Sequence, residues 1–215
     1  MRLRPVKHAS DTIEKHPERI TLIDREETIA LDDVFSTLQP LVLEIGAGKG
    51  QFCHALASLR PDLNVLAVEK FDSVIIRALE KQLDDPRSNL HLVRTDAEKL
   101  VDCLKPHSVQ TIYLNFSDPW PKARHEKRRL THPRFLAMYR TLLKPGGTLE
   151  FKTDNRGLFE YSLKTLFESG LELSDVSLDL HADAPEDNIM TEFEARYGED
   201  GPIYTLIATF KEENA

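Results

Sequence analysis

A short apolar run that ends in a glycine-rich turn constrains the fold of this chain more than any other feature. Residues 41–45 read Leu-Val-Leu-Glu-Ile, residues 46–50 read Gly-Ala-Gly-Lys-Gly, and residues 51–59 carry apolar side chains at helical spacing. A strand, a glycine turn and a helix in this order let the backbone approach a ligand closely and direct helix N–H groups at it. The stretch therefore predicts a ligand-binding α/β fold, with a purely structural tight turn as the alternative.

The spacing of the glycines argues against two classes of nucleotide site. A P-loop requires Ser or Thr after Gly-Lys, but Gly50 stands there, so nucleotide hydrolysis is not expected. A dinucleotide site requires the pattern GxGxxG, and here the third glycine comes one residue early, which leaves less room for a pyrophosphate. A nicotinamide-dependent oxidoreductase is therefore the least favoured class of enzyme.

Acidic residues accompany three successive predicted strands. Glu44 lies within the first apolar run, Glu69 ends the second, and Asp96 follows the third. Ligands of open parallel sheets bind at the carboxyl ends of the strands, and neighbouring carboxylates there need partners. A ligand with hydroxyls, an amine and a positive charge supplies them, which indicates S-adenosylmethionine rather than ATP. Asp96 can also cap the following helix, as Asp72 can cap its own.

The alternation of strand and helix patterns predicts a mostly parallel α/β sheet of seven strands with helices on both faces. The strands are expected at residues 41–45, 64–69, 90–95, 111–116, 148–153, 171–180 and 203–210. The helices are expected at residues 51–59, 72–83, 133–143 and 158–169. The last two strands are expected to be antiparallel, with no clear helix between them. Residues 1–40 are expected to form a partly helical N-terminal arm, and residues 41–215 a single domain.

Composition favours a soluble globular protein, with 40% hydrophobic and 30% charged residues in 215. No apolar run approaches the roughly 18 residues that cross a bilayer, and no secretory signal follows the basic start, so a cytoplasmic protein without membrane contact is expected. Cys53 and Cys103 are expected to be two reduced thiols rather than a disulfide. The histidines show no metal-binding spacing, so no metal site is expected.

The charge distribution is uneven. A net charge of −8 argues against a general nucleic-acid binder, because phosphate binding needs cations. Residues 122–129, however, contain five lysines and arginines and one acid, and Arg2, Arg4 and Lys7 form a second small basic group. The pattern fits a protein that contacts nucleic acid in one place, with a solvated surface as the alternative.

A bend with two prolines directly precedes this basic tract. Residues 115–121 read Asn-Phe-Ser-Asp-Pro-Trp-Pro. Proline fixes its own φ and restricts the preceding residue, so Asp118 and Trp120 are expected to be held in defined directions just past a strand. A carboxylate beside a cationic tract suggests chemistry on an anionic substrate. Trp120 either stacks on a base or closes the edge of the core.

With these motifs in place, the chain resembles the bacterial tRNA (guanine-N7-)-methyltransferases, enzymes of the class I, Rossmann-like S-adenosylmethionine-dependent fold, from about residue 40 onward. The resemblance rests on the glycine motif, on residues 115–131, on Phe-Lys-Thr-Asp at 151–154 and on Thr-x-Phe-Glu at 191–194. It implies transfer of a methyl group from S-adenosylmethionine to N7 of a guanosine in the variable loop of tRNA. The sequence leaves the oligomeric state open.

The resemblance also assigns residues. The implied cofactor-binding residues are Glu44, Gly46, Gly48, Gly50, Glu69, Asp96, Ala97 and Asp118, and Asp118 is also the implied catalytic residue. The implied substrate- and RNA-binding residues are Lys122, Arg124, His125, Glu126, Lys127, Arg128, Arg129, Asp154, Thr191, Glu192, Phe193 and Glu194. For the last motif, a capping box formed by Thr191 and Glu194 is a sufficient structural explanation by itself.

Two other classes of protein remain as alternatives. A small-molecule methyltransferase would account for the glycine turn and the acids at the strand ends, but it would leave the basic tract without a role. A non-catalytic RNA-binding module would have no use for the four acids Glu44, Glu69, Asp96 and Asp118.

Overall fold

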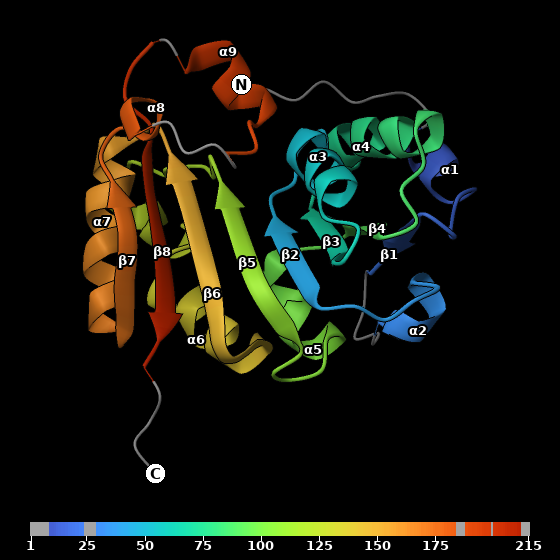
Figure 1. The fold of residues 1–215 in the computed structure, drawn as a ribbon, viewed down its shortest axis with the longest axis horizontal. Coiled ribbons are helices and arrows are strands. Elements are labelled where there is room, and N and C mark those ends of the chain that lie inside the picture. Colours follow the sequence, from blue (N-terminus) through green and yellow to red (C-terminus); the bar gives the residue numbers. More distant parts are fainter. Residues whose placement is uncertain (1–8, 24–28, 184–187, 199, 212–215) are drawn as a thin grey trace. The chain divides into compact units, whose positions relative to one another are not determined.

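A computed structural model describes residues 9–23, 29–183, 188–198 and 200–211 (Figure 1). They fall into two compact units, a first unit within Met1–Lys105 and a second unit within Pro106–Ala215. The basic group of Arg2, Arg4 and Lys7 lies outside the described residues. The expected division into an arm and one domain stays a prediction.

The first unit is built on four parallel strands in the order β1-β4-β3-β2. Their bounds are β1 (Ile20–Leu22), β2 (Leu41–Ile45), β3 (Asn64–Glu69) and β4 (Leu90–Arg94). Every residue of β2 and the first five of β3 are buried. Such continuous apolar runs are typical of parallel strands that are covered on both faces.

Among the helices of the first unit, α3 and α4 pack against each other and against strands β3 and β4. The helical bounds are α1 (Ala9–Ile13), α2 (Leu31–Val34), α3 (Gln51–Leu59), α4 (Asp72–Asp84), the 3-10 helix η1 (Ala97–Lys99) and α5 (Leu100–Cys103). The predicted strands β2 to β4 and helix α3 are confirmed.

Two details of the first unit differ from the prediction. Strand β1 lies within residues 1–40, where no strand was expected, because a strand of three residues is too short to show a periodic pattern. Asp72 is not an N-cap: Phe71 holds that position without a side-chain hydrogen bond, and Asp72 is the first helical residue. The Asp72 carboxylate instead accepts from Ser10 at 3.1 Å and pairs with Arg94 at 3.1 Å.

The second unit is built on four strands in the order β5-β6-β8-β7. Their bounds are β5 (Val109–Asn115), β6 (Leu143–Thr153), β7 (Leu171–Ser177) and β8 (Tyr204–Phe210). β5 and β6 are parallel, whereas β8 runs antiparallel to both β6 and β7. The antiparallel final pair is confirmed. The described residues thus contain eight strands rather than seven, and the additional one is β1.

The start of β6 differs from the prediction. Leu143 already pairs with Val109, and the next pair joins Thr111 to Thr148, so residues 144–147 form an irregularity within the strand. The Lys-Pro-Gly-Gly sequence of these residues is typical of a turn, which is why the strand was expected to begin only at Thr148.

The helices of the second unit lie between the strands in the chain (Figure 1). Their bounds are the 3-10 helix η2 (Ala123–Arg128), α6 (Pro133–Leu142), α7 (Arg156–Glu168), α8 (Leu180–Asp183) and α9 (Glu192–Tyr197). α7 contacts α6 and packs against β6, β7 and β8. The short helices α8 and α9 stand where no clear helix was expected, although the capping box that starts α9 is confirmed.

Glu194 anchors α9 to the rest of the second unit. Its side chain is buried, and its carboxylate accepts from Lys152 Nζ at 2.9 Å and from Asn188 Nδ2 at 2.7 Å. His181 Nε2 of α8 lies 3.1 Å from the same carboxylate, and the backbone N–H of Thr191 donates to it at 3.4 Å. One buried acid therefore ties α9 to β6 and to α8.

The surroundings of Glu194 favour its ionised form. Burial acts to raise the pKa of the carboxyl group, but the hydrogen bonds from Asn188 and Lys152 and the charge of Lys152 outweigh it, so the pKa lies below the usual 4.5. Ionised Glu194 thus stabilises the folded state above pH 4.5, and this stabilisation is lost as the pH falls through the lower folded-state pKa.

We expect Glu194→Gln to lower the free energy of unfolding at neutral pH by about 3 kcal/mol, because it leaves the Lys152 ammonium with no carboxylate partner. Urea unfolding at neutral pH and at acid pH measures this. The wild-type protein should lose more stability than the variant on acidification. Glu192→Gln, an exposed position of the same helix, is the control. Equal acid sensitivity of Glu194→Gln and the wild type would contradict the role of Glu194.

Candidate active site

The glycine turn of the first unit adopts left-handed backbone conformations at each of its three glycines. Their φ angles are 84° at Gly46, 59° at Gly48 and 77° at Gly50. A Cβ at Gly46 would meet no atom within 4 Å, and one at Gly48 would meet only the Gly46 carbonyl oxygen at 4.0 Å. A Cβ at Gly50 would lie 2.6 Å from Ala78 Cβ. The first two glycines therefore border open space, while Gly50 allows α3 to approach α4.

The Glu69 carboxylate holds this turn in place. One of its oxygens accepts from Gly48 N at 3.1 Å, and the other accepts from Lys70 N at 2.8 Å and Phe71 N at 3.1 Å. The side chain is partly exposed. The acid therefore holds the turn while part of its side chain stays accessible to a ligand.

Glu44 occupies a more enclosed position, with 3% of its surface exposed. It lies near the buried thiol of Cys53, whose Sγ donates to the Gly50 carbonyl oxygen at 3.4 Å. Burial, and after it the charge of Glu44, raises the pKa of the Cys53 thiol well above its usual value. The thiol therefore stays protonated beside the acid. Cys103 is likewise buried and takes part in no disulfide among the described residues.

Asp96 caps the next helical segment, as expected. Its side chain accepts from Glu98 N at 3.2 Å at the start of η1, where Ala97 is the first residue. The other carboxylate oxygen forms an ion pair with Lys70 Nζ at 2.5 Å. Both groups remain partly exposed, so this acid too is held in position and still accessible.

The three acids follow one another along the carboxyl edge of the sheet of the first unit, because β4, β3 and β2 are neighbours and all parallel. Open space over Gly46 and Gly48, next to Glu69, suits a ligand that comes close to the backbone. Carboxylates suit the hydroxyls, the amine and the positive charge of S-adenosylmethionine. The residues of the first unit therefore fit this cofactor.

In the second unit, the bend after β5 carries Asp118 on the surface. The residues on both sides of Asp118 depart from ordinary geometry: Phe116 has a φ of 49° and Trp120 a φ of 42°. Left-handed conformations are uncommon for bulky residues and require support from their surroundings. The aspartate is thus exposed on a bend with a special backbone conformation.

The basic tract forms the 3-10 helix η2 directly after this bend. Four of its long cationic side chains are exposed, those of Lys122, Arg124, Lys127 and Arg128. His125 and Glu126 are partly buried. The Arg128 guanidinium lies 4.8 Å from the centroid of the Trp120 ring, and the His125 ring meets the same indole edge-on at 5.6 Å. The half-buried Trp120 thus packs under two residues of the tract.

Arg129, the last member of the tract, behaves differently from its neighbours. It is partly buried, and it donates from Nε to the Pro119 carbonyl oxygen and from Nη2 to the Trp120 carbonyl oxygen, both at 3.1 Å. Its guanidinium lies 4.2 Å from the centroid of the Tyr161 ring. Burial, and after it the charge of Glu126, raises the pKa of Tyr161 to about 12, so the ring under the guanidinium is uncharged.

The remaining predicted substrate residues divide into exposed and buried ones. Asp154, Glu192 and Phe193 are exposed, whereas Thr191 and Glu194 are buried in the capping box. The Phe193 ring lies 4.7 Å from the ring of Phe116. Three partners of Glu194 were not predicted from the sequence: Lys152, Asn188 and His181. A lysine between the apolar residues of β6 was the available signal for the first of these.

Two further findings concern only the residues that the structure describes. None of their helices is long and apolar enough to pass through a membrane. No group of three or more His, Cys, Asp or Glu side chains among them is arranged to hold a metal ion.

Comparison with known proteins places the chain in a family. Residues 38–206 match a family model described as "Putative methyltransferase". The chain is 48% identical over 211 residues to the tRNA (guanine-N(7)-)-methyltransferase of Lactiplantibacillus plantarum, covering 98% of this chain and 99% of that protein. It is 51% identical over 172 residues to the enzyme of the same name from Bacillus subtilis, covering 80% of this chain and 81% of that protein.

Solved structures show the same fold at low sequence identity. The 16S rRNA methyltransferase KamB superimposes with a TM-score of 0.64 at 17% identity, covering 85% of this chain and 93% of that one. A 16S rRNA (adenine(1408)-N(1))-methyltransferase from Catenulisporales acidiphilia, solved with its cosubstrate SAM, gives a TM-score of 0.60 at 17% identity, with 84% and 89% covered. The expected Rossmann-like methyltransferase fold is confirmed. On the similarity of nearly the whole chain to the curated enzymes, the chain belongs to the tRNA (guanine-N(7)-)-methyltransferase family.

Proposed function

We propose that this chain transfers a methyl group from S-adenosylmethionine to N7 of a guanosine in tRNA, and that this guanosine lies in the variable loop. The observation that carries the proposal is the 48% identity with a tRNA (guanine-N(7)-)-methyltransferase over 98% of the chain. The exposed carboxylate of Asp118 next to the basic helix η2 supports it from the structure. The reaction as proposed uses no metal ion and takes place in the cytoplasm.

The first unit supplies the proposed cofactor-binding residues. When bound, S-adenosylmethionine supplies a methyl group on a positively charged sulfur. The carboxylates of Glu69 and Asp96 accept hydrogen bonds from cofactor hydroxyl and amine groups, and the negative charge of Glu44 favours a cationic ligand. Gly46 and Gly48 allow the backbone to approach the ligand, and Gly50 completes the same turn. Ala97 is the first residue of η1, directly after Asp96.

The second unit supplies the proposed catalytic group, Asp118. Guanine N7 has an in-plane lone pair and no proton at neutral pH, so its methylation requires no general base. The protein has to hold the nucleophile in line, an effect worth up to roughly 7–11 kcal/mol. Positive charge develops on the purine as the new bond forms, and a fixed carboxylate stabilises that charge. Asp118 also accepts hydrogen bonds from the guanine N–H groups that adenine lacks.

The exposed cationic side chains of η2 and of Lys122 bind the RNA backbone in this proposal. Bases within A-form helices are poorly accessible, so a protein of this kind recognises the phosphates and the shape and takes one exposed base from a loop. Asp154 and Phe193, both exposed, contact the substrate.

The proposed function is tested by incubating the protein with labelled S-adenosylmethionine and unmodified tRNA, followed by nucleoside analysis. Label is expected in N7-methylguanosine, and sequencing of the modified position is expected to place it in the variable loop. A small-metabolite pool, incubated in parallel, should stay unlabelled. Label in the metabolites and none in tRNA would identify a small-molecule methyltransferase, and label in neither would point to a non-catalytic RNA-binding protein.

For the catalytic residue, we expect Asp118→Ala to lower kcat by roughly 10²–10³-fold, because removal of one preorganised electrostatic group in an active site has this effect. The affinity for S-adenosylmethionine, measured by calorimetry, should fall only modestly. Asp118→Asn keeps the shape without the charge and should behave like the alanine variant. Near-normal turnover in either variant would remove Asp118 from the mechanism.

For the basic tract, we expect Arg124→Glu combined with Arg128→Glu to weaken tRNA binding and to reduce the salt dependence of the binding constant, by about one unit of slope per lost phosphate contact. Binding measured over a series of salt concentrations checks this. Arg77→Glu combined with Lys164→Glu changes the net charge equally at exposed positions of α4 and α7 and should leave binding nearly unchanged. If the two double variants bind tRNA equally, the tract is a solvated surface.

A further inference from the structure

The bend that carries Asp118 is held at both ends by left-handed residues that are not glycine. Phe116 and Trp120 have φ angles of 49° and 42°, in a region that bulky L residues rarely adopt. Pro119 and Pro121 remove further freedom between and after them. Such a conformation persists only when neighbouring groups fix it, so the contacts of each end decide how the Asp118 carboxylate points.

The Phe116 end is fixed by the sheet and by α9. The Phe116 N–H donates to the Lys152 carbonyl oxygen at 2.8 Å, which continues the pairing of β5 with β6. The Phe116 ring lies 4.7 Å from the ring of Phe193, which in turn lies 4.8 Å from the ring of Tyr197. This end of the bend is therefore supported by backbone pairing and by aromatic packing.

The Trp120 end lies beyond the strand pairing that the structure describes for β5, and Arg129 holds it instead. Two N–H groups of one guanidinium donate to the consecutive carbonyl oxygens of Pro119 and Trp120, each at 3.1 Å. The guanidinium is itself placed over the Tyr161 ring of α7 at 4.2 Å. A planar fork can satisfy two adjacent carbonyls at once, which the single ammonium of a lysine does not reproduce.

From this geometry we propose that Arg129 is a positioning residue that fixes the backbone of Trp120 and thereby orients Asp118 for methyl transfer, rather than an RNA-contacting member of the basic tract. The proposal rests on the proposed function for the part that concerns catalysis. It separates two adjacent arginines: Arg128 is exposed and lies over the Trp120 ring, whereas Arg129 is partly buried and bonded to the bend itself.

The test is Arg129→Lys, which keeps the charge and removes the fork. The expected result is a fall in kcat of about 10²-fold, because a misplacement of about 1 Å at a reacting group has this effect. The KM for tRNA and the salt dependence of tRNA binding should stay within about twofold of the wild type. Trp120 is the only tryptophan, so quenching of its fluorescence by acrylamide reports directly on the bend and should increase in the variant.

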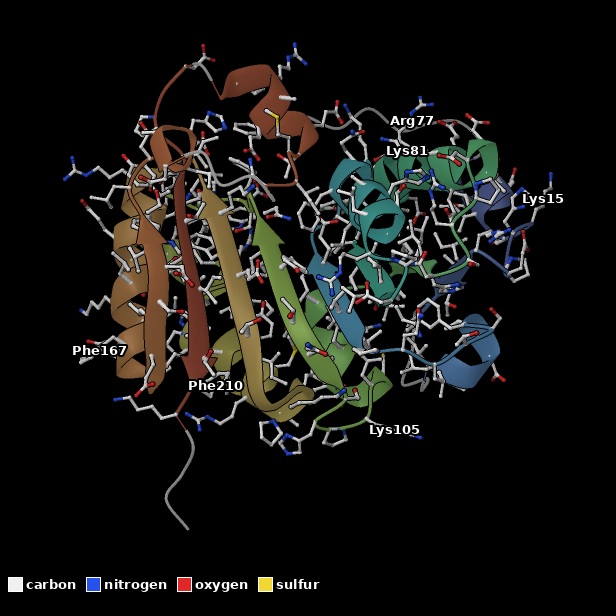
Figure 2. All side chains as sticks on the ribbon, viewed as in Figure 1. Lys15, Arg77, Lys81, Lys105, Phe167 and Phe210 are labelled. Atoms are coloured by element: carbon white, nitrogen blue, oxygen red, sulfur yellow. The ribbon has the colours of Figure 1, made fainter. Side chains whose placement is uncertain are left out.

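The chain offers a matched control in Arg140. This arginine also donates to a backbone carbonyl oxygen, that of Ser169 at 3.0 Å, and also lies over an aromatic ring, that of Phe210 at 4.5 Å. Figure 2 shows Phe210 at the end of β8 away from α9 within the same unit. Arg140→Lys should lower the thermal stability to a similar extent as Arg129→Lys, yet leave kcat and the Trp120 quenching unchanged.

Specific results would overturn the proposal. A raised KM and a reduced salt slope with unchanged kcat in Arg129→Lys would make Arg129 a phosphate contact instead. Unchanged kcat together with unchanged Trp120 quenching would show that the two hydrogen bonds do not hold the bend. Should the lysine variant fail to fold, Tyr161→Leu removes the ring under the guanidinium and should produce a smaller fall in kcat at unchanged KM.

The failure of the proposed function is distinguishable from the failure of this inference. Absence of N7-methylguanosine with the wild-type protein would refute the function. The Trp120 quenching of Arg129→Lys and Arg140→Lys needs no substrate, so it still decides whether Arg129 fixes the bend.

Discussion

The hydrogen bonds between the Glu69 carboxylate and three backbone N–H groups determine the shape of the first unit where a ligand can approach it. They join Gly48, in the turn after β2, to Lys70 and Phe71, at the start of the segment after β3. Left-handed glycines alone would leave this turn free to move, because glycine gains its range of conformations at an entropic cost to folding. The carboxylate removes that freedom in advance, so a ligand does not have to supply the ordering itself.

In the second unit, too, a charged side chain fixes backbone by hydrogen bonds, but there the charge is positive. There, the cation of Arg129 satisfies carbonyl oxygens of the bend, and the buried pair of Glu194 with Lys152 fixes α9. In both places of the second unit a charged side chain bonds to backbone or to a buried partner, and a different side chain next to it stays exposed. Asp118 and Phe193 are the exposed members next to these anchors. Fixed polar groups of this kind stabilise developing charge without reorganising during the reaction.

The sequence predicted the elements whose signals are local. β2, α3 and β3 follow from apolar runs broken by glycine, and the start of α9 follows from the Thr191–Glu194 capping box. β1 was missed, because three residues carry no periodicity and its position depends on pairing with β4. The beginning of β6 was misplaced, because its Pro-Gly-Gly segment reads as a turn until the pairing with β5 is known. Tertiary pairing overrides local propensity in both places.

Roles within the basic tract were beyond sequence reasoning for a related reason. Arg128 and Arg129 are adjacent and chemically identical. The folded backbone of the bend and the Tyr161 ring, far along the chain, separate the exposed arginine from the one that is bonded to the bend. The net charge of −8 is a poor guide to phosphate binding for the same reason. It adds the charges of the whole chain, whatever their distance from a bound phosphate. At physiological ionic strength exposed charges are screened beyond about 8 Å, so a phosphate near η2 responds mainly to the cations beside it. An acidic protein can therefore present a cationic surface, provided that exposed basic side chains lie close together in the chain, as Arg124, Lys127 and Arg128 do within η2.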